Sequence, residues 1–175
     1  MFRFFKLIHK ETKPLPLILI LFYLCTWFYM QYTQREIHYE YEGVMFQKNN
    51  LEDVVPLNIY IDGKYTIDLF VGNDEFSGKL IIGEYVFEEC SLKFNKRGMA
   101  SLEMNPFDRN SSEFNGMIFI SRLFKEFTIE VFEQADDGVY KPNGILISAP
   151  SKKRNEAVRI ANKLMGRALR GYRID

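Results

Sequence analysis

The first pattern along the chain is an uncharged apolar run close to the N-terminus. No charged residue occurs from Leu15 to Met30, and the run lacks the polar stripe that a helix on a soluble core usually shows. At ~1.5 Å of rise per residue, a helix from Leu15 to Tyr32 reaches about 27 Å, close to the hydrocarbon thickness of a bilayer. Trp27, Tyr29 and Tyr32 gather at its far end, where aromatic rings settle at headgroup depth. The pattern predicts a single transmembrane helix over residues 14–32.

Charges on either side of this run predict its orientation. Four bases and one acid precede it, whereas three acids and one base follow it by Glu42, and the basic flank of a membrane helix stays in the cytoplasm. The run ends in the bulky segment 26–29, which offers no small-residue site for cleavage of a signal peptide. We therefore expect a cytoplasmic N-terminus at 1–13, a signal anchor in the cell membrane at 14–32 and an extracytoplasmic domain at 33–175.

Beyond the run, apolar and polar residues alternate with the period of two that is typical of strands. Two such segments between residues 57 and 71 flank Asp62-Gly63, a pair typical of tight hairpins. Further segments flank Gly83-Glu84 and a turn at 95–98, and three more strands are predicted at 117–121, 127–132 and 145–149. The weaker alternation of residues 37–46 leaves open whether they form a first strand or a stalk.

The period changes after Pro150 from that of a strand to that of a helix. Ser151 is placed to cap a helix, and five apolar residues then fall on one helical face, namely Ala157, Ile160, Ala161, Leu164 and Ala168. We predict an amphipathic C-terminal helix over residues 151–171. An antiparallel meander of about eight strands followed by one helix indicates a mainly-β (α+β) domain, built as a bent sheet or a small barrel.

Composition adds an uneven distribution of charge. Of the 23 bases, four precede the apolar run and eight follow Pro150, which leaves 11 for residues 33–149, where 20 of the 23 acids lie. A net charge of zero thus conceals an acidic body and a basic C-terminal segment. The two cysteines, Cys25 and Cys90, cannot form a disulfide within the distal domain. An exported domain without a disulfide is more typical of a bacterial cell envelope than of eukaryotic secretion.

Residue types that catalysis or metal binding require are scarce. His38 is the only histidine beyond the apolar run, so a Ser-His-Asp triad, a Cys-His pair or a histidine metal site would have to include it. Its position just after the anchor favours a solvated stalk residue. Cys90 is in phase with Leu92 and Phe94, which favours a small core residue over a nucleophile. We predict no catalytic residue, no metal and no cofactor, and therefore a protein that is not an enzyme.

A row of bases on the predicted C-terminal helix is the one candidate binding feature. Arg159, Lys163, Arg167 and Arg170 recur at helical spacing. The row either binds an anionic lipid headgroup, wall polymer or nucleic acid, with an affinity that falls as salt rises, or it complements the acidic sheet and faces solvent. Long basic side chains commonly coat a helix that packs through alanines, which favours the second interpretation.

Three functions follow from these patterns. The favoured hypothesis is a non-enzymatic, membrane-tethered extracytoplasmic domain that binds a protein partner or takes part in an assembly of the cell envelope, without a small-molecule substrate. The first alternative is an anion-binding module that works through the basic helix. The second is an envelope hydrolase that uses a pair of carboxylates, since a sequence does not show which acids meet in space.

Overall fold

The computed structural model describes residues 14–50, 54–68, 70–103 and 114–174. The chain divides into two compact units, Met1–Arg35 and Glu36–Asp175, and each unit is described by itself. Predictions that fall on residues 1–13 and on most of the loop at 105–115 lie outside the described residues.

The N-terminal unit contains helix α2, Pro14–Thr33. The Thr26 hydroxyl donates to the carbonyls of Phe22 and Tyr23 at 3.0 and 2.9 Å, so this polar group is satisfied inside the helix. The large apolar side chains from Leu17 to Tyr29 are exposed. A helix over residues 14–32 is therefore confirmed. Among the described residues, however, no helix combines the length and the apolarity that crossing a membrane requires, so the transmembrane assignment stays a prediction.

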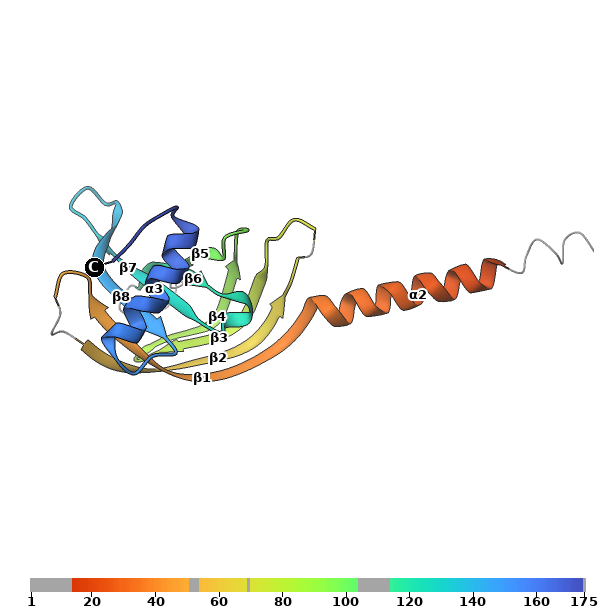
Figure 1. Cartoon of the computed structure of the whole chain (residues 1–175), viewed down its shortest axis with the longest axis horizontal. Coiled ribbons are helices and arrows are strands. Elements are labelled where there is room, and N and C mark those ends of the chain that lie inside the picture. Colours follow the sequence, from red (N-terminus) through yellow and green to blue (C-terminus); the bar gives the residue numbers. More distant parts are fainter. Residues whose placement is uncertain (1–13, 51–53, 69, 104–113, 175) are drawn as a thin grey trace, which may run out of the picture. The chain divides into compact units, whose positions relative to one another are not determined.

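The second unit is an eight-stranded antiparallel sheet that curls into a nearly closed barrel (Figure 1). Its strands are hydrogen-bonded in the order β4-β3-β2-β1-β8-β7-β6-β5. The bounds are β1 Gln34–Gln47, β2 Val54–Thr66, β3 Glu75–Ile82, β4 Tyr85–Lys93, β5 Met99–Glu103, β6 Asn115–Ile120, β7 Phe127–Gln134 and β8 Tyr140–Ala149.

This order confirms the predicted meander within each half of the sheet and shows where the barrel opens. The first and last strands pair at the centre, with Val44 opposite Ser148 and Gln47 opposite Ile145. The two edges are instead β4 and β5, which follow each other in sequence. Residues 37–46 belong to β1, so the strand is the correct one of the two predicted alternatives and the stalk is wrong.

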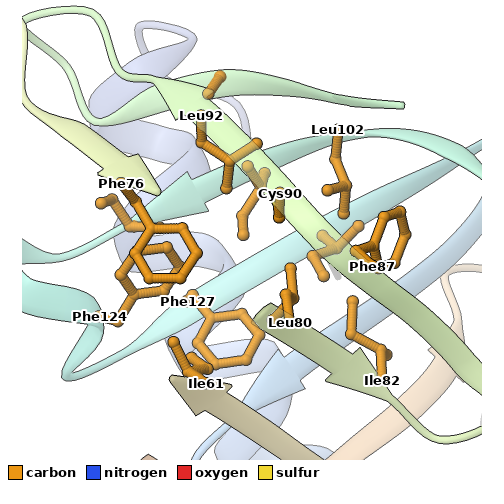
Figure 2. Packing of buried hydrophobic residues seen from close by; sticks show 14 of the residues in the cluster. Ile61, Phe76, Leu80, Ile82, Phe87, Cys90, Leu92, Leu102, Phe124 and Phe127 are labelled. Atoms are coloured by element: carbon orange, nitrogen blue, oxygen red, sulfur yellow. The ribbon is translucent and has the colours of Figure 1, made fainter. Parts of the chain in front are cut away.

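Two apolar layers stabilise the barrel, one inside it and one outside. Inward-facing side chains fill the interior, where Figure 2 shows Phe124 among Phe76, Phe127 and the aliphatic residues of β2 to β4. Outside, helix α3, Arg154–Ala168, packs across β6, β7 and β8 (Figure 1). Its buried face consists of Ala157, Ile160, Ala161, Leu164, Met165 and Ala168, which confirms the predicted apolar face.

The N-terminal boundary of this helix differs from the prediction. The helix spans 154–168 rather than 151–171, and Ser151 is not its cap. Ser151 is buried instead, and its hydroxyl donates to the Ser148 carbonyl at 2.7 Å. Lys153 is the cap residue, and the Glu156 carboxylate in the first turn accepts the amide of Lys152, just before the cap, at 2.9 Å.

The predicted Asp62-Gly63 hairpin is wrong, because β2 runs straight through both residues. Gly63 pairs with Gly78 of β3. A Cβ at Gly63 would lie 2.4 Å from the Ser77 carbonyl oxygen, and one at Gly78 would lie 2.2 Å from that of Asp62. The glycines therefore permit a close approach of two bent strands. Glycine inside a strand often marks such a close approach of two backbones rather than a turn.

Candidate functional site

The four bases predicted to form a row on the helix lie in different surroundings. Arg159 lines a shallow hollow between α3 and the C-terminal segment 171–173, and Lys163 forms an ion pair with Glu126. The Arg167 guanidinium donates through Nη2 to the carbonyls of Arg97 and Ile120, at 3.1 and 2.9 Å. Arg170 follows the helix with a φ of 56°. Lys163 and Arg167 therefore join the helix to the barrel, and binding of an anion by the row of four stays a prediction.

The loop between β2 and β3 lies at the end of the barrel where the chain enters the domain. His38, near the start of β1, meets Asp62, near the end of β2, with 2.6 Å between Nδ1 and Oδ1. Because neighbouring strands are antiparallel, the start of β1 and the exit from β2 lie side by side (Figure 1).

Three further segments reach the same end of the barrel. They are the turn between β4 and β5, the segment between β6 and β7 that contains the short helix η1, Arg122–Phe124, and the C-terminus of α3. The bonds that hold them there are Phe94 N–H to the Asp74 carbonyl at 2.8 Å, Ile120 N–H to the Gly98 carbonyl at 2.8 Å, and Arg97 Nη1 to the Ala168 carbonyl at 2.9 Å.

The side chain of Phe124 plugs this end from within. It is fully buried, and its ring lies 5.1 Å from Phe76 and 5.6 Å from Phe94 in edge-to-face arrangements. Leu123 and Phe124 both have positive φ angles, 61° and 54°, a conformation that non-glycine residues adopt rarely. Burial of the Phe124 ring offsets the cost of this backbone. We call this part of the barrel, formed by the four segments above, the closed end.

The closed end carries an excess of positive charge. Four acids lie on its segments, and two of them, Glu75 and Glu126, form ion pairs with Lys93 at 3.7 Å and with Lys163. Six of its eight bases form no ion pair with any acid in the described part of the chain. The exposed bases of the closed end are Lys93, Lys96, Arg97, Arg122, Lys125, Lys163, Arg167 and Arg170.

The other two acids order the loop between β2 and β3. Asp68 Oδ1 accepts the amides of Phe70 and Val71, both at 2.9 Å, and these bonds hold the pKa of the Asp68 carboxyl below its ordinary value. Asp74 accepts the Asp68 amide at 3.0 Å and the Tyr65 hydroxyl at 2.7 Å. The loop so held presents Phe70, 83% exposed, and Val71, 52% exposed.

The opposite end of the barrel contains a cavity of about 590 Å³, and we call it the open end. Its walls are mostly apolar, with Leu57 and Ile82 on one side and a Tyr85–Phe114 ring pair at 4.7 Å. Glu84 and Glu133 also line it, and among the described lining residues there is no base. Among the described residues, the two ends of the barrel therefore differ in charge, and a cavity lies at the open end.

His38 belongs to a row of paired polar side chains on the outer face rather than to a stalk. Asp62 also accepts the Tyr60 hydroxyl at 3.3 Å, and it lies opposite Lys79, which pairs with Glu88 at 2.8 Å. The negative charge of Asp62 is the main reason why the pKa of Tyr60, which is partly exposed, is raised. These side chains pair with one another across four strands, and cross-strand pairs of this kind commonly stabilise a sheet.

The described residues bring together no nucleophile, base and orienting acid. Cys90 is buried (Figure 2), and burial raises the pKa of its thiol to about 12, so it stays protonated at neutral pH. No group of three or more His, Cys, Asp or Glu side chains in the described ranges could hold a metal ion. Cys90 as a small core residue is confirmed.

No protein-family model, curated protein or solved structure matches this chain. Its function is therefore inferred from its own geometry. Sequence reasoning missed Lys93, Lys96, Arg97, Arg122 and Lys125, which lie at a strand end and in two separate connections. Each connection carries a short basic signal, but only the strand order brings the connections together.

Proposed function

We propose that the protein is a membrane-tethered, non-enzymatic binding protein of the cell envelope. Helix α2 is the tether, and the barrel holds its open end away from the membrane for a protein partner. One observation carries the proposal. In the described part of the chain, the end where the chain enters the domain is plugged and basic, whereas the opposite end holds an apolar cavity lined by two acids.

The character of α2 supports its role as the tether. The helix has 20 residues, and none of them is charged. Large apolar side chains are exposed along its described part, a cost in water that a bilayer removes. The basic N-terminal flank in the sequence directs the barrel to the extracytoplasmic side.

The open end supports binding of a protein segment. A cavity of about 590 Å³ is large enough for one or two apolar side chains. Glu84 and Glu133 favour a partner whose anchoring residues are flanked by bases, because opposite charges steer association. The expected partner is therefore an envelope protein that presents an apolar side chain beside Lys or Arg.

Orientation is tested in intact cells with single cysteines in a Cys25→Ser, Cys90→Ser background. A membrane-impermeant maleimide should label Glu88→Cys, on the exposed outer face of the barrel, without permeabilisation. Lys6→Cys should be labelled only after permeabilisation. The reverse pattern would overturn the proposed topology.

Partner binding is tested by photo-crosslinking in the native membrane. A photoreactive residue at Val55 or Glu133, both on the cavity wall, should yield a discrete protein adduct, and the same residue at Glu88 should not. With the photoreactive residue at Val55, Glu84→Lys together with Glu133→Lys should remove the adduct. Equal adducts from the cavity and from Glu88 would contradict binding at the open end.

The hydrolase alternative keeps one specific observation, since Glu84 and Glu133 line the same cavity. Two carboxyls facing one substrate are the arrangement that glycoside hydrolysis uses. Under this hypothesis Glu84→Gln or Glu133→Gln should abolish release of fragments from envelope glycans while the fold is kept. Glycan release that is absent from the unmodified protein, or unchanged in both variants, would exclude it.

The anion-binding alternative is supported by the closed end rather than by the helix row alone. Arg170 and Arg167 contribute to it, whereas Arg159 lies in the separate hollow on α3. Charge reversal at Lys96, Lys125 and Arg170 should then weaken binding to polyanions more than reversal at Arg159. The difference should shrink as salt rises.

A further inference from the structure

We infer that the closed end is a second membrane contact, in which Phe70 and Val71 enter the interface of an anionic bilayer and the surrounding bases bind its headgroups. This inference rests on the proposed tether. The tether α2 holds the barrel next to the membrane. The loop between β2 and β3 has a further role, because its contact fixes which surface of the domain faces the lipid.

The apolar tip is built into the loop between β2 and β3. Phe70 is the most exposed of the described large apolar residues of the barrel. The backbone beneath it is held by Asp68, which accepts two amides, and by Asp74, which accepts a third amide and the Tyr65 hydroxyl. These four bonds hold the backbone on either side of Phe70 and Val71, whose side chains point outward.

The short connection from α2 to β1 limits how far this loop can lie from the bilayer. Thr33 ends α2, and Glu36, which begins the barrel, follows three residues later. Three residues span at most about 11 Å, so a membrane-embedded α2 keeps the start of β1 near the bilayer surface. The contact between His38 and Asp62 places the exit of β2, and hence the loop, beside that start.

Bases of the closed end lie around the apolar tip. Lys96 approaches Gly72 of the loop, with its Cγ 3.5 Å from the position that a Cβ on Gly72 would take. Arg122 acts on the Tyr65 hydroxyl electrostatically from the neighbouring segment. Bases that surround an apolar tip are typical of peripheral membrane contacts, where apolar insertion and attraction to anionic lipid act together.

The experiment uses tryptophan fluorescence of the full-length protein reconstituted in lipid vesicles. The chain has one tryptophan, Trp27, so a Trp27→Phe background accepts a single new reporter. Val71→Trp reports on the loop. Val139→Trp is the matched control, because Val139 is equally exposed, 54% against 52%, but lies in the turn between β7 and β8 at the open end.

In vesicles that contain phosphatidylglycerol, brominated lipids should quench the fluorescence of Val71→Trp at least twofold more than that of Val139→Trp. Charge reversal by Lys96→Glu with Lys125→Glu should reduce the quenching of the loop reporter, and so should vesicles of phosphatidylcholine alone. If Val71→Trp disturbs the fold by circular dichroism, Phe70→Trp replaces it. Quenching of the loop reporter no greater than that of the control overturns the inference, and points to a protein partner for the loop.

Failure of the tether is distinguished from failure of the loop contact by a second measurement. In the unmodified chain, Trp27 should be quenched by lipids brominated along the acyl chains if α2 is embedded. An unquenched Trp27 overturns the proposed tether, and with it the basis of this inference. A quenched Trp27 together with an unquenched loop reporter in Val71→Trp overturns the loop contact alone.

Discussion

At the scale of single residues, Cys90 tests how tightly the barrel interior is closed. Burial raises the pKa of its thiol to about 12, so at pH 8 the reactive thiolate is nearly absent from the folded chain. In a Cys25→Ser variant, a thiol reagent should modify Cys90 at least a hundredfold more slowly in buffer than in guanidinium chloride. Comparable rates in the two solvents would show that the interior opens freely.

The Tyr65 hydroxyl predicts how stability depends on alkaline pH. Burial, and then its bond to Asp74, raise the pKa of Tyr65 above its ordinary value near 10, and burial raises that of Tyr41 to about 12. A raised pKa in the folded state means that stability is complete below pH ~10 and falls as pH rises toward the folded-state values. Urea unfolding at pH 8 and pH 11 should show this loss.

Tyr65→Phe separates the contribution of Tyr65 from that of Tyr41. The variant should lose about 1 kcal/mol at pH 8, because the hydrogen bond to Asp74 is absent. It should then lose less than the unmodified chain between pH 8 and pH 11. An equal alkaline loss in both proteins would show that Tyr65 does not titrate with unfolding.

At the scale of elements, β2 and β3 depend on two facing glycines. A Cβ at Gly78 would lie 2.2 Å from a backbone oxygen, and backbone cannot move aside as a flexible side chain can. Gly78→Ala should therefore destabilise the domain by about 3 kcal/mol or more. Gly138→Ala, where a Cβ meets nothing within 4 Å but φ is 76°, should cost only about 1 kcal/mol. Urea midpoints that fall equally would contradict the close approach.

The same glycines show which elements sequence reasoning predicts well. Alternation predicted most strands, and the period of the C-terminal segment predicted the buried face of α3, because both signals are local. The hairpin predicted at Asp62-Gly63 was wrong. A glycine that a turn needs for its positive φ cannot be told from a glycine that allows close approach of two strands when only the sequence is known. The missing information was Gly78, sixteen residues from Asp62 and opposite Gly63 only in the folded sheet.

At the scale of the whole molecule, the candidate sites depend on strand order, which the sequence does not contain. The closed end draws its bases from β4, two connections and α3, and these meet only because β1 pairs with β8 and leaves β4 and β5 at the edges. The basic helix was visible as a row, but Lys163 and Arg167 engage the barrel. Periodicity locates a charged face and does not reveal what covers it.

Helix α3 also joins the two halves of the sheet, so its packing should control the stability of the whole domain. It covers β6, β7 and β8, and it contacts the other half through Arg154, which donates to the Lys48 carbonyl at 3.4 Å. The bond from Arg97 to Ala168 joins it to the turn that connects the two halves. Leu164 is 2% exposed in the outer apolar layer. Leu164→Ala should therefore lower the free energy of unfolding by about 2–5 kcal/mol.

The unfolding of Leu164→Ala should remain a single transition, because the inner and outer apolar layers share β1, β6 and β8. Arg159→Ala, an exposed position on the same helix, is the matched control and should change stability by less than about 0.5 kcal/mol. Urea unfolding of the full chain, followed by circular dichroism, measures both. A second transition, or an unchanged midpoint for Leu164→Ala, would show that α3 is an appendage rather than part of the structure that holds the barrel halves together.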